Sequence, residues 1–257
     1  MARFFVDELP AEGAEYRLTG ENAAHAKVLR LRPGEAVTLC DGRGTDCPCT
    51  VTEGLTLLAG AALPCPAEPR TAVSLWLAFP KADKAEHVIQ KAVELGAAEL
   101  VFFPSRYCVS RPEGKALENK LERWRKIARS AAEQSRRGVV PPVRAVGSYA
   151  QALREAAAAE LSVLFYENEE NYGIREALAE EHVGTSIACP RTSNARPYIQ
   201  NRTVSLMTGA EGGFSEEEIE QARAAGLRIC TLGPRILRCE TAPLAGLTAV
   251  MYAMGEI

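Results

Sequence analysis

The chain has 257 residues, of which 47% are hydrophobic and 25% are charged, so it can fold into one large globular domain or two smaller ones. Its formal net charge of −3 excludes a protein that is basic throughout. The lack of an 18-residue apolar run and of an apolar leader predicts a cytoplasmic protein without a transmembrane helix or signal peptide.

Residues 1–70 consist of short β-like segments separated by turn residues. The apolar segment 37–40 is followed by the turn signal DGRG, and a second strand is predicted at 49–52. One short helix fits residues 21–29. This pattern is typical of a small β-barrel, which we expect to form an N-terminal domain.

Three prolines in the segment 63–69 exclude a helix and predict an extended linker. From residue 71 onward, strands and helices alternate. We expect strands at 73–78, 100–103, 161–166, 204–207 and 227–232, and helices at 83–95, 115–137, 148–159, 215–226 and 241–254. This alternation predicts an α/β domain at 71–257, in which helices cover both faces of a parallel sheet.

Two helix starts carry a more specific signal. Asp83 with Glu86, and Ser215 with Glu218, each have the spacing of a capping box. The polar segment 189–203 predicts an exposed loop.

The eight cysteines show no spacing typical of a zinc site. Cys47 and Cys49 are the nearest pair, and only one residue separates them. We therefore expect reduced thiols and no bound metal.

Charge is distributed unevenly along the chain. Residues 115–144 contain nine Lys and Arg against three Asp and Glu, a local excess of +6. This excess indicates either a phosphate-binding surface or a solvated helix face.

Two connections between a predicted strand and a predicted helix are rich in polar residues. The segment 208–214 (TGAEGGF) contains three glycines, which let the backbone approach a ligand closely or simply form a tight turn. The segment 232–241 (LGPRILRCET) is long for such a connection, which favours a functional loop over a surface ion pair between Arg235 and Glu240. Ligands of parallel sheets bind at the carboxyl ends of the strands, so both loops predict a site for a nucleotide-like cofactor and an anionic substrate.

At these loops the sequence resembles the bacterial small-subunit ribosomal RNA uracil-N3 methyltransferases of the SPOUT superfamily, and the resemblance extends over nearly the whole chain. It is carried by residues 25–30 (HAKVLR), the pairs 33–34 and 41–42, Lys84, and the segments 89–96 (IQKAVELG), 124–128 (WRKIA), 133–137 (EQSRR), 209–213 and 232–241. The sequence departs from the family at Ala210, where a proline is usual, and at Cys239, where a threonine is expected.

The resemblance implies a PUA-like RNA-binding barrel followed by a trefoil-knotted SPOUT domain that binds S-adenosylmethionine between three loops. The cofactor-binding residues it implies are Leu164, Phe165, Tyr166, Gly209, Ala210, Glu211, Gly212, Gly213, Leu232, Gly233, Ile236, Leu237, Arg238 and Thr241. It also implies a homodimer; Leu244, Leu247, Met251 and Met254 could form its interface or pack inside the domain.

The implied reaction is methylation of N3 of a uridine in 16S ribosomal RNA, with the small ribosomal subunit as partner. Removing the N3 proton requires a base or a group that stabilises the uracilate anion. We expect Arg238 to stabilise the anion or hold a phosphate, and Glu240, or alternatively Glu211, to take the proton or orient Arg238. Expected RNA contacts are His25, Lys27, Arg30, Arg32 and Arg43 in the barrel, and Arg123, Lys126, Arg136 and Arg137 in the basic segment.

Three other functions compete with this one. A SPOUT methyltransferase with another RNA target shares the fold and the cofactor. A non-catalytic ribosome-assembly factor shares the RNA-binding surface, although the intact loops argue against loss of the cofactor. A Rossmann-type nucleotide enzyme is disfavoured because the G-x-G-x-x-G fingerprint is missing.

Overall fold

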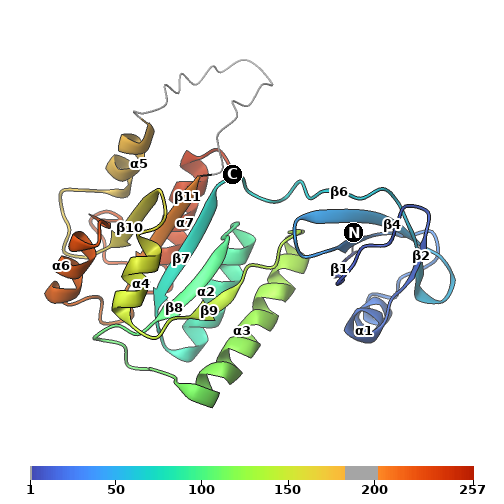
Figure 1. Ribbon diagram of the computed structural model, residues 1–257, viewed down its shortest axis with the longest axis horizontal. Coiled ribbons are helices and arrows are strands. Elements are labelled where there is room, and N and C mark those ends of the chain that lie inside the picture. The colour runs from blue at the N-terminus through green and yellow to red at the C-terminus, as the bar shows by residue number, and fades with distance from the viewer. Residues whose placement is uncertain (1, 183–201) are drawn as a thin grey trace. The chain divides into compact units, whose positions relative to one another are not determined.

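The computed structural model describes residues 2–182 and 202–257 (Figure 1). The chain forms two compact units, one of Met1–Glu68 with Arg129–Val140 and the other of Pro69–Ala128 with Pro141–Ile257. The sequence pattern placed a single division at residue 70. It gave no sign that residues 129–140 pack with the first unit, because these residues begin inside a helix.

The first unit is built on a six-stranded, mostly antiparallel sheet. Its strands follow the order β1-β3-β4-β5-β2, β6 pairs with β4, and only β1 and β3 run parallel. The elements are β1 (Ala2–Phe5), β2 (Glu15–Arg17), α1 (Gly20–Leu29), β3 (Ala36–Cys40), β4 (Thr45–Val51), a 3₁₀ turn (Glu53–Leu55), β5 (Thr56–Ala59) and β6 (Leu63–Pro64). The proline-rich segment is therefore not only a linker, because its first two residues form an edge strand, where the missing proline N–H is tolerated.

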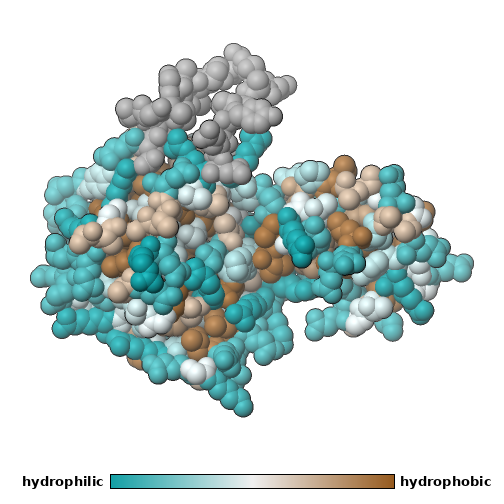
Figure 2. Space-filling model, viewed as in Figure 1, coloured by the Kyte–Doolittle hydropathy of each residue, from teal (hydrophilic) through white to brown (hydrophobic). Residues whose placement is uncertain are grey.

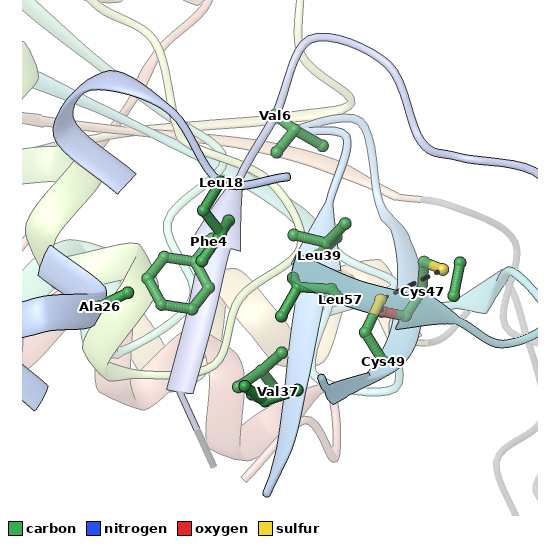
Figure 3. Packing of buried hydrophobic residues seen from close by; sticks show 11 residues of the cluster. Phe4, Val6, Leu18, Ala26, Val37, Leu39, Cys47, Cys49 and Leu57 are labelled. Carbon is green, nitrogen blue, oxygen red and sulfur yellow. Dashed lines mark hydrogen bonds between the residues drawn. The ribbon is translucent and has the colours of Figure 1, made fainter. Parts of the chain in front are cut away.

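Alternating side chains of this sheet form a small apolar core (Figure 3). Phe4, Leu39 and Leu57 are completely buried and come from three different strands. Cys47 and Cys49 belong to the same core, and their sulfur atoms lie 3.8 Å apart. Apart from Cys189, which lies outside the described residues, the cysteines are free, and most are buried.

A buried network of two ion pairs ties the segment 129–140 to this sheet. The guanidinium of Arg3 binds both carboxylate oxygens of Asp46, at 2.6 and 2.7 Å, and donates to the backbone oxygen of Arg137 at 3.2 Å. Arg137 in turn lies 2.8 Å from the carboxylate of Glu68, which also accepts the N–H groups of Gly138 and Val139. Every buried charge in this network thus has a partner, as burial requires.

The second unit contains a six-stranded sheet in which every pairing is parallel. Its order is β12-β10-β11-β7-β8-β9, and the strands are β7 (Ala72–Ala78), β8 (Glu99–Phe103), β9 (Val143–Ala145), β10 (Leu161–Phe165), β11 (Thr203–Thr208) and β12 (Arg228–Cys230). The central strands are mostly apolar because both faces of the sheet are covered.

Helices cover both faces of this sheet (Figure 1). Neighbouring residues of β8 show the division: Phe102 packs on Trp124 of α3 (Gly114–Gln134), whereas Phe103 packs on Tyr149 of α4 (Tyr149–Ala156). The remaining helices are α2 (Ala82–Glu94), α5 (Ile174–His182), α6 (Glu216–Ala224) and α7 (Ala242–Ala253). Hydrophilic residues cover most of the face drawn in Figure 2, as expected when the apolar side chains pack inside.

The helix boundaries bear out one capping prediction and contradict another. Ser215 and Glu218 form a complete capping box at the start of α6. Asp83 does not cap α2, because the helix begins one residue before it and Lys81 occupies the cap position without a side-chain hydrogen bond. Asp83 instead lies in the first helical turn, where its charge is favourable to the helix dipole.

Further differences concern short elements, a predicted loop and the last helix. The three-residue strand β9 and helix α5 were not predicted, because neither has a long periodic pattern. Of the predicted loop 189–203, residues 189–201 lie outside the described part, and Thr203 begins β11. In α7, Leu247, Met251 and Met254 are buried within the unit and belong to its core, whereas Leu244 is half-buried.

The buried network generates the first prediction. Arg137→Ala should lower the free energy of unfolding by about 3 kcal/mol, because it leaves the half-buried carboxylate of Glu68, 19% exposed, without its ion-pair partner. Arg136→Ala, at the exposed neighbour, should change it by less than about 0.5 kcal/mol. Urea denaturation of both variants measures the difference, and equal effects would contradict the structural role of Arg137.

Candidate functional site

Three loops of the second unit begin at one edge of the sheet. Strands β12, β10 and β11 are neighbours and run parallel, so the segments that follow them start side by side. These segments enclose a cavity of about 740 Å³. Its lining consists of Phe165, Tyr166, Glu167, Glu169 and Glu170 after β10, Thr208–Ala210, Glu211 and Gly213 after β11, Thr231–Cys239 and Ala242 after β12, and Lys84 of α2.

Backbone shape explains the glycines after β11. Gly213 has a φ of +64°, and a Cβ there would collide with the carboxylate of Glu167. A Cβ on Gly209 would lie 2.9 Å from the Cα of Gly213. The N–H of Gly213 donates to the carbonyl of Ala210 at 3.0 Å, which closes a tight turn. The loop can therefore keep this shape against the cavity only with small residues.

Two further features prepare the cavity for a ligand. The hydroxyl of Thr208 is buried and has no hydrogen-bond partner among the described residues, which a ligand could supply. Gly246 of α7 leaves room for the ring of Phe165, since a Cβ at this position would collide with it. The cavity thus combines an apolar wall with an unsatisfied polar group, as ligand sites commonly do.

A charged cluster lies at the side of the cavity. The Nζ atom of Lys84 is 3.0 Å from Oε2 of Glu240 and 3.4 Å from Oε1 of Glu211. It also lies 3.5 Å from the sulfur of Cys239. Each of the three charged side chains is about one quarter exposed, at 26, 23 and 21% for Lys84, Glu211 and Glu240.

The cluster shifts the pKa of each member. Burial opposes ionisation of Glu211, but hydrogen bonds from backbone amides, including that of Lys81, and from Lys84 lower the pKa of this carboxyl. The pKa of Glu240 is lowered in the same way, against burial, by its backbone amide, Lys84 and Cys239. The hydrogen bond to Glu240 raises the pKa of Lys84 despite desolvation. Burial raises the pKa of Cys239 to about 11. At neutral pH the cluster therefore holds one ammonium, two carboxylates and a neutral thiol.

The structure gathers most of the predicted cofactor residues around the cavity. Three of them do not line it, namely Leu164, Gly212 and Thr241. Leu164 is completely buried in the sheet, and Gly212 lies against Tyr107, to whose Cβ its own Cβ would approach within 2.7 Å. Sequence reasoning did not assign Lys84 to the site, because it lies far from both loops in the chain and shows its role only through its contacts.

The predicted catalytic residues occupy different positions. Glu211 and Arg238 line the cavity, whereas Glu240 is not among the lining residues and its carboxylate binds Lys84. Arg238 is exposed, and its guanidinium has no hydrogen bond or ion pair within residues 2–182 and 202–257. The surface ion pair considered between Arg235 and Glu240 is not formed in this part of the chain, since Glu240 binds Lys84 instead.

The expected RNA-binding residues fall into two groups. His25, Lys27, Arg30, Arg32 and Arg43 are exposed on the first unit, where the ring of His25 also packs edge-on against Phe4. Arg123 and Lys126 are exposed on α3, and each is paired with a glutamate. Arg136 is exposed beyond the end of this helix. The prediction that Arg137 contacts RNA is wrong. This residue is only 4% exposed and is bound to Glu68, so it cannot contact a phosphate.

The sequence predicts neither a metal site nor a transmembrane helix. Among the described residues, no group of three or more His, Cys, Asp or Glu side chains is arranged to hold a metal ion. No helix in the same part of the chain is long and apolar enough to span a membrane.

Comparison with known proteins places this site in a family. An RNA methyltransferase domain model matches residues 67–251, and an RNA methyltransferase PUA domain model matches residues 18–55. The ribosomal RNA small subunit methyltransferase E of Bacillus subtilis is 32% identical over 260 residues, which cover 98% of this chain and 96% of that protein. This chain belongs to the ribosomal RNA small subunit methyltransferase E family. The family resemblance and the PUA-plus-α/β fold class expected from the sequence are thereby confirmed.

Solved structures agree with this assignment. A family member from Neisseria gonorrhoeae, bound to S-adenosylmethionine, is 31% identical, with a TM-score of 0.78 and coverage of 98% of this chain and 97% of that one. A methyltransferase from Legionella pneumophila in complex with the same cofactor is 26% identical, with a TM-score of 0.76 over 98% and 97% of the two chains. These complexes bear out S-adenosylmethionine as the cofactor expected from the sequence. The trefoil knot stays a prediction.

The residues around the cavity fit this cofactor. The glycines after β11 allow close approach to the backbone, and the free hydroxyl of Thr208 offers a hydrogen bond. The carboxylates of Glu167, Glu169 and Glu170 line the same cavity and complement the positive sulfonium and ammonium groups of S-adenosylmethionine. Within the family fold, this chain therefore has a cofactor cavity of suitable size and charge.

The glycine loop generates the second prediction. Gly213→Ala should weaken S-adenosylmethionine binding about tenfold, because the new Cβ meets Glu167 and alanine is strained at positive φ. Gly255→Ala is the control, since Gly255 also has a positive φ, of +71°, but open space around its Cβ. Titration calorimetry should show wild-type affinity for the control. Wild-type affinity in both variants would mean that the loop does not shape the cofactor site.

Proposed function

We propose that this protein transfers the methyl group of S-adenosylmethionine to N3 of a uridine in 16S ribosomal RNA, with the assembled small subunit as substrate. Family membership supports an rRNA methyltransferase that uses S-adenosylmethionine. The observation that carries the finer proposal is the cavity, whose lining includes a carboxylate of lowered pKa and an arginine that has no hydrogen bond or ion pair among the described residues. An anion-stabilising group and a proton acceptor are the two kinds of group that assist reaction at a weakly acidic N–H.

S-adenosylmethionine supplies an electrophilic methyl group when it is bound. N3 of uridine carries a proton, and its lone pair is delocalised into the two neighbouring carbonyl groups. Loss of this proton leaves a uracilate anion whose charge lies on N3 and the two carbonyl oxygens. Arg238 can approach such an anion, because its guanidinium is exposed at the cavity and has no other partner among the described residues.

Glu211 is the better candidate for the proton acceptor. Its carboxylate lines the cavity, and Oε1 binds both Lys84 and the N–H of Lys81. Glu240 is not among the lining residues, so we propose Glu211 rather than Glu240 as the proton acceptor. Because a lowered pKa makes Glu211 a weak base, we assign the larger share of catalysis to stabilisation of the anion by Arg238.

The exposed cations on each unit are the proposed contacts to the RNA backbone. Lys27, Arg30, Arg32 and Arg43 supply positive charge on the first unit, where exposed His25 is a further proposed contact, and Arg123, Lys126 and Arg136 supply positive charge along the segment 115–144. Phosphate contacts position an RNA without reading its sequence, so the shape of a folded ribosomal subunit would select the target. We also propose the homodimer that the resemblance implies.

The main test is methyl transfer from labelled S-adenosylmethionine to small ribosomal subunits that lack the modification, followed by nucleoside mass spectrometry. We expect N3-methyluridine as the labelled product, with much less transfer to free 16S ribosomal RNA. Another methylated nucleoside would overturn the specificity while keeping the enzyme class. Cofactor binding without transfer to any RNA would favour an assembly factor.

The proposed role of Arg238 gives a separate prediction. Arg238→Ala should lower kcat by about 100-fold or more while S-adenosylmethionine affinity stays within about threefold, because the arginine acts on the substrate anion. Arg235→Ala is the matched control, an exposed arginine that lines the same cavity. Single-turnover assays with calorimetry separate the two effects. Full activity of Arg238→Ala would exclude it from the reaction.

A further inference from the structure

Lys84 connects three segments that are far apart in the sequence. It belongs to the first turn of α2, whereas Glu211 follows β11 and Glu240 follows β12. Its ammonium lies within 3.4 Å of both carboxylates and 3.5 Å from the sulfur of Cys239. One side chain thus joins the two loops that supply the proposed catalytic residues.

The charge balance of this cluster makes the lysine important. Two carboxylates share one ammonium, so the group carries a net negative charge. The described structure gives Glu211 and Glu240 no second side-chain cation as a direct partner. Without Lys84, two like charges would remain together at a partly desolvated site, and at least one would tend to take up a proton.

Helix stability does not account for a lysine at this position. Lys84 is the third residue of α2, where the partial positive charge of the helix N-terminus opposes a cation. Asp83 and Glu86 could satisfy that end of the helix without it. The contacts of Lys84 with the carboxylates of Glu211 and Glu240 explain a lysine at this position, whereas the stability of the helix does not.

We propose that Lys84 is a positioning residue for methyl transfer: it holds Glu211 and Glu240 together and ionised, so that the glycine loop and the arginine loop form one site. The inference rests on the proposed function, because that function assigns the proton to Glu211, which shares the ammonium of Lys84 with Glu240. Lys84 itself neither takes the proton nor touches the target base.

Other charged groups of the cavity affect the same carboxylates more weakly. Arg235 and Arg238 come from the loop after β12, and Glu167, Glu169 and Glu170 from the segment after β10. Within the described residues none of them makes a direct contact with Glu211 or Glu240. The ionisation of Glu211 and Glu240 should therefore depend mainly on Lys84.

The test compares Lys84→Met, Lys84→Arg and Lys91→Met. Lys91 is a matched control, because it also lies on α2 and pairs with a glutamate, Glu94, but does not line the cavity. NMR titration of the carboxylates in the cofactor-free protein should show that Lys84→Met raises the pKa of Glu211 or Glu240 by about one unit. Lys91→Met should leave both values unchanged.

The same variants are then assayed for methyl transfer across pH 4.5 to 8.5. Raising the carboxylate pKa by about one unit moves the acidic limb of the rate profile to higher pH, so Lys84→Met should lose about two- to threefold in kcat at pH 4.5 and little at pH 8. Lys84→Arg should recover most of this activity. S-adenosylmethionine affinity, measured by calorimetry at both pH values, should change less than kcat.

Two results would overturn the proposal: carboxylate pKa values that do not respond to Lys84→Met, or a uniform loss of rate at all pH values without recovery in Lys84→Arg. The second pattern would mean that Lys84 only stabilises the fold. If the wild-type protein does not methylate uridine at N3 but the titration shows the expected shift, the proposed function fails while the control of the carboxylates by Lys84 is supported.

Discussion

Parallel pairing of β10 with β11 and β12 is the constraint on which the site depends. Parallel neighbours deliver their carboxyl ends to one edge, so three loops from distant parts of the chain surround one cavity. Helices on both faces bury this sheet and fix the loops at their bases. The small residues Gly209, Gly213 and Gly246 then allow the backbone and the ring of Phe165 to approach more closely than larger side chains would permit.

The two units use buried charge differently. In the first unit, Arg3, Asp46, Glu68 and Arg137 pair inside the fold and attach residues 129–140 to the sheet. In the second, Lys84, Glu211 and Glu240 remain partly exposed beside the cavity. A fully paired, buried network can support structure but cannot meet a substrate. A partly exposed cluster with more negative than positive charge can exchange a proton.

This arrangement gives a consistent view of how an rRNA methyltransferase of this family could treat a weakly acidic N–H group. In the proposed mechanism, the guanidinium of Arg238 stabilises the developing anion, Glu211 accepts the proton, and Lys84 keeps the carboxylate pair ionised. Acidic residues of the cavity complement the positive cofactor, and we propose that exposed cations on each unit contact the phosphates of the RNA.

Local patterns in the sequence were enough to predict the two-part organisation, the parallel α/β sheet and both loops at the cavity, because apolar periodicity, glycines and capping residues act locally. The sequence also carried motifs specific enough to indicate the family. The burial of Arg137 against Glu68, the packing of α7 on the sheet and the contacts of Lys84 with Glu211 and Glu240 were visible only in the folded chain. The two ion-pair groups join residues that lie 69 to 156 positions apart along the chain. For α7, the apolar pattern did not show which part of the protein would cover its apolar face. The physical reason is that exposure and ion pairing depend on which segments meet in space, and no local pattern encodes that meeting.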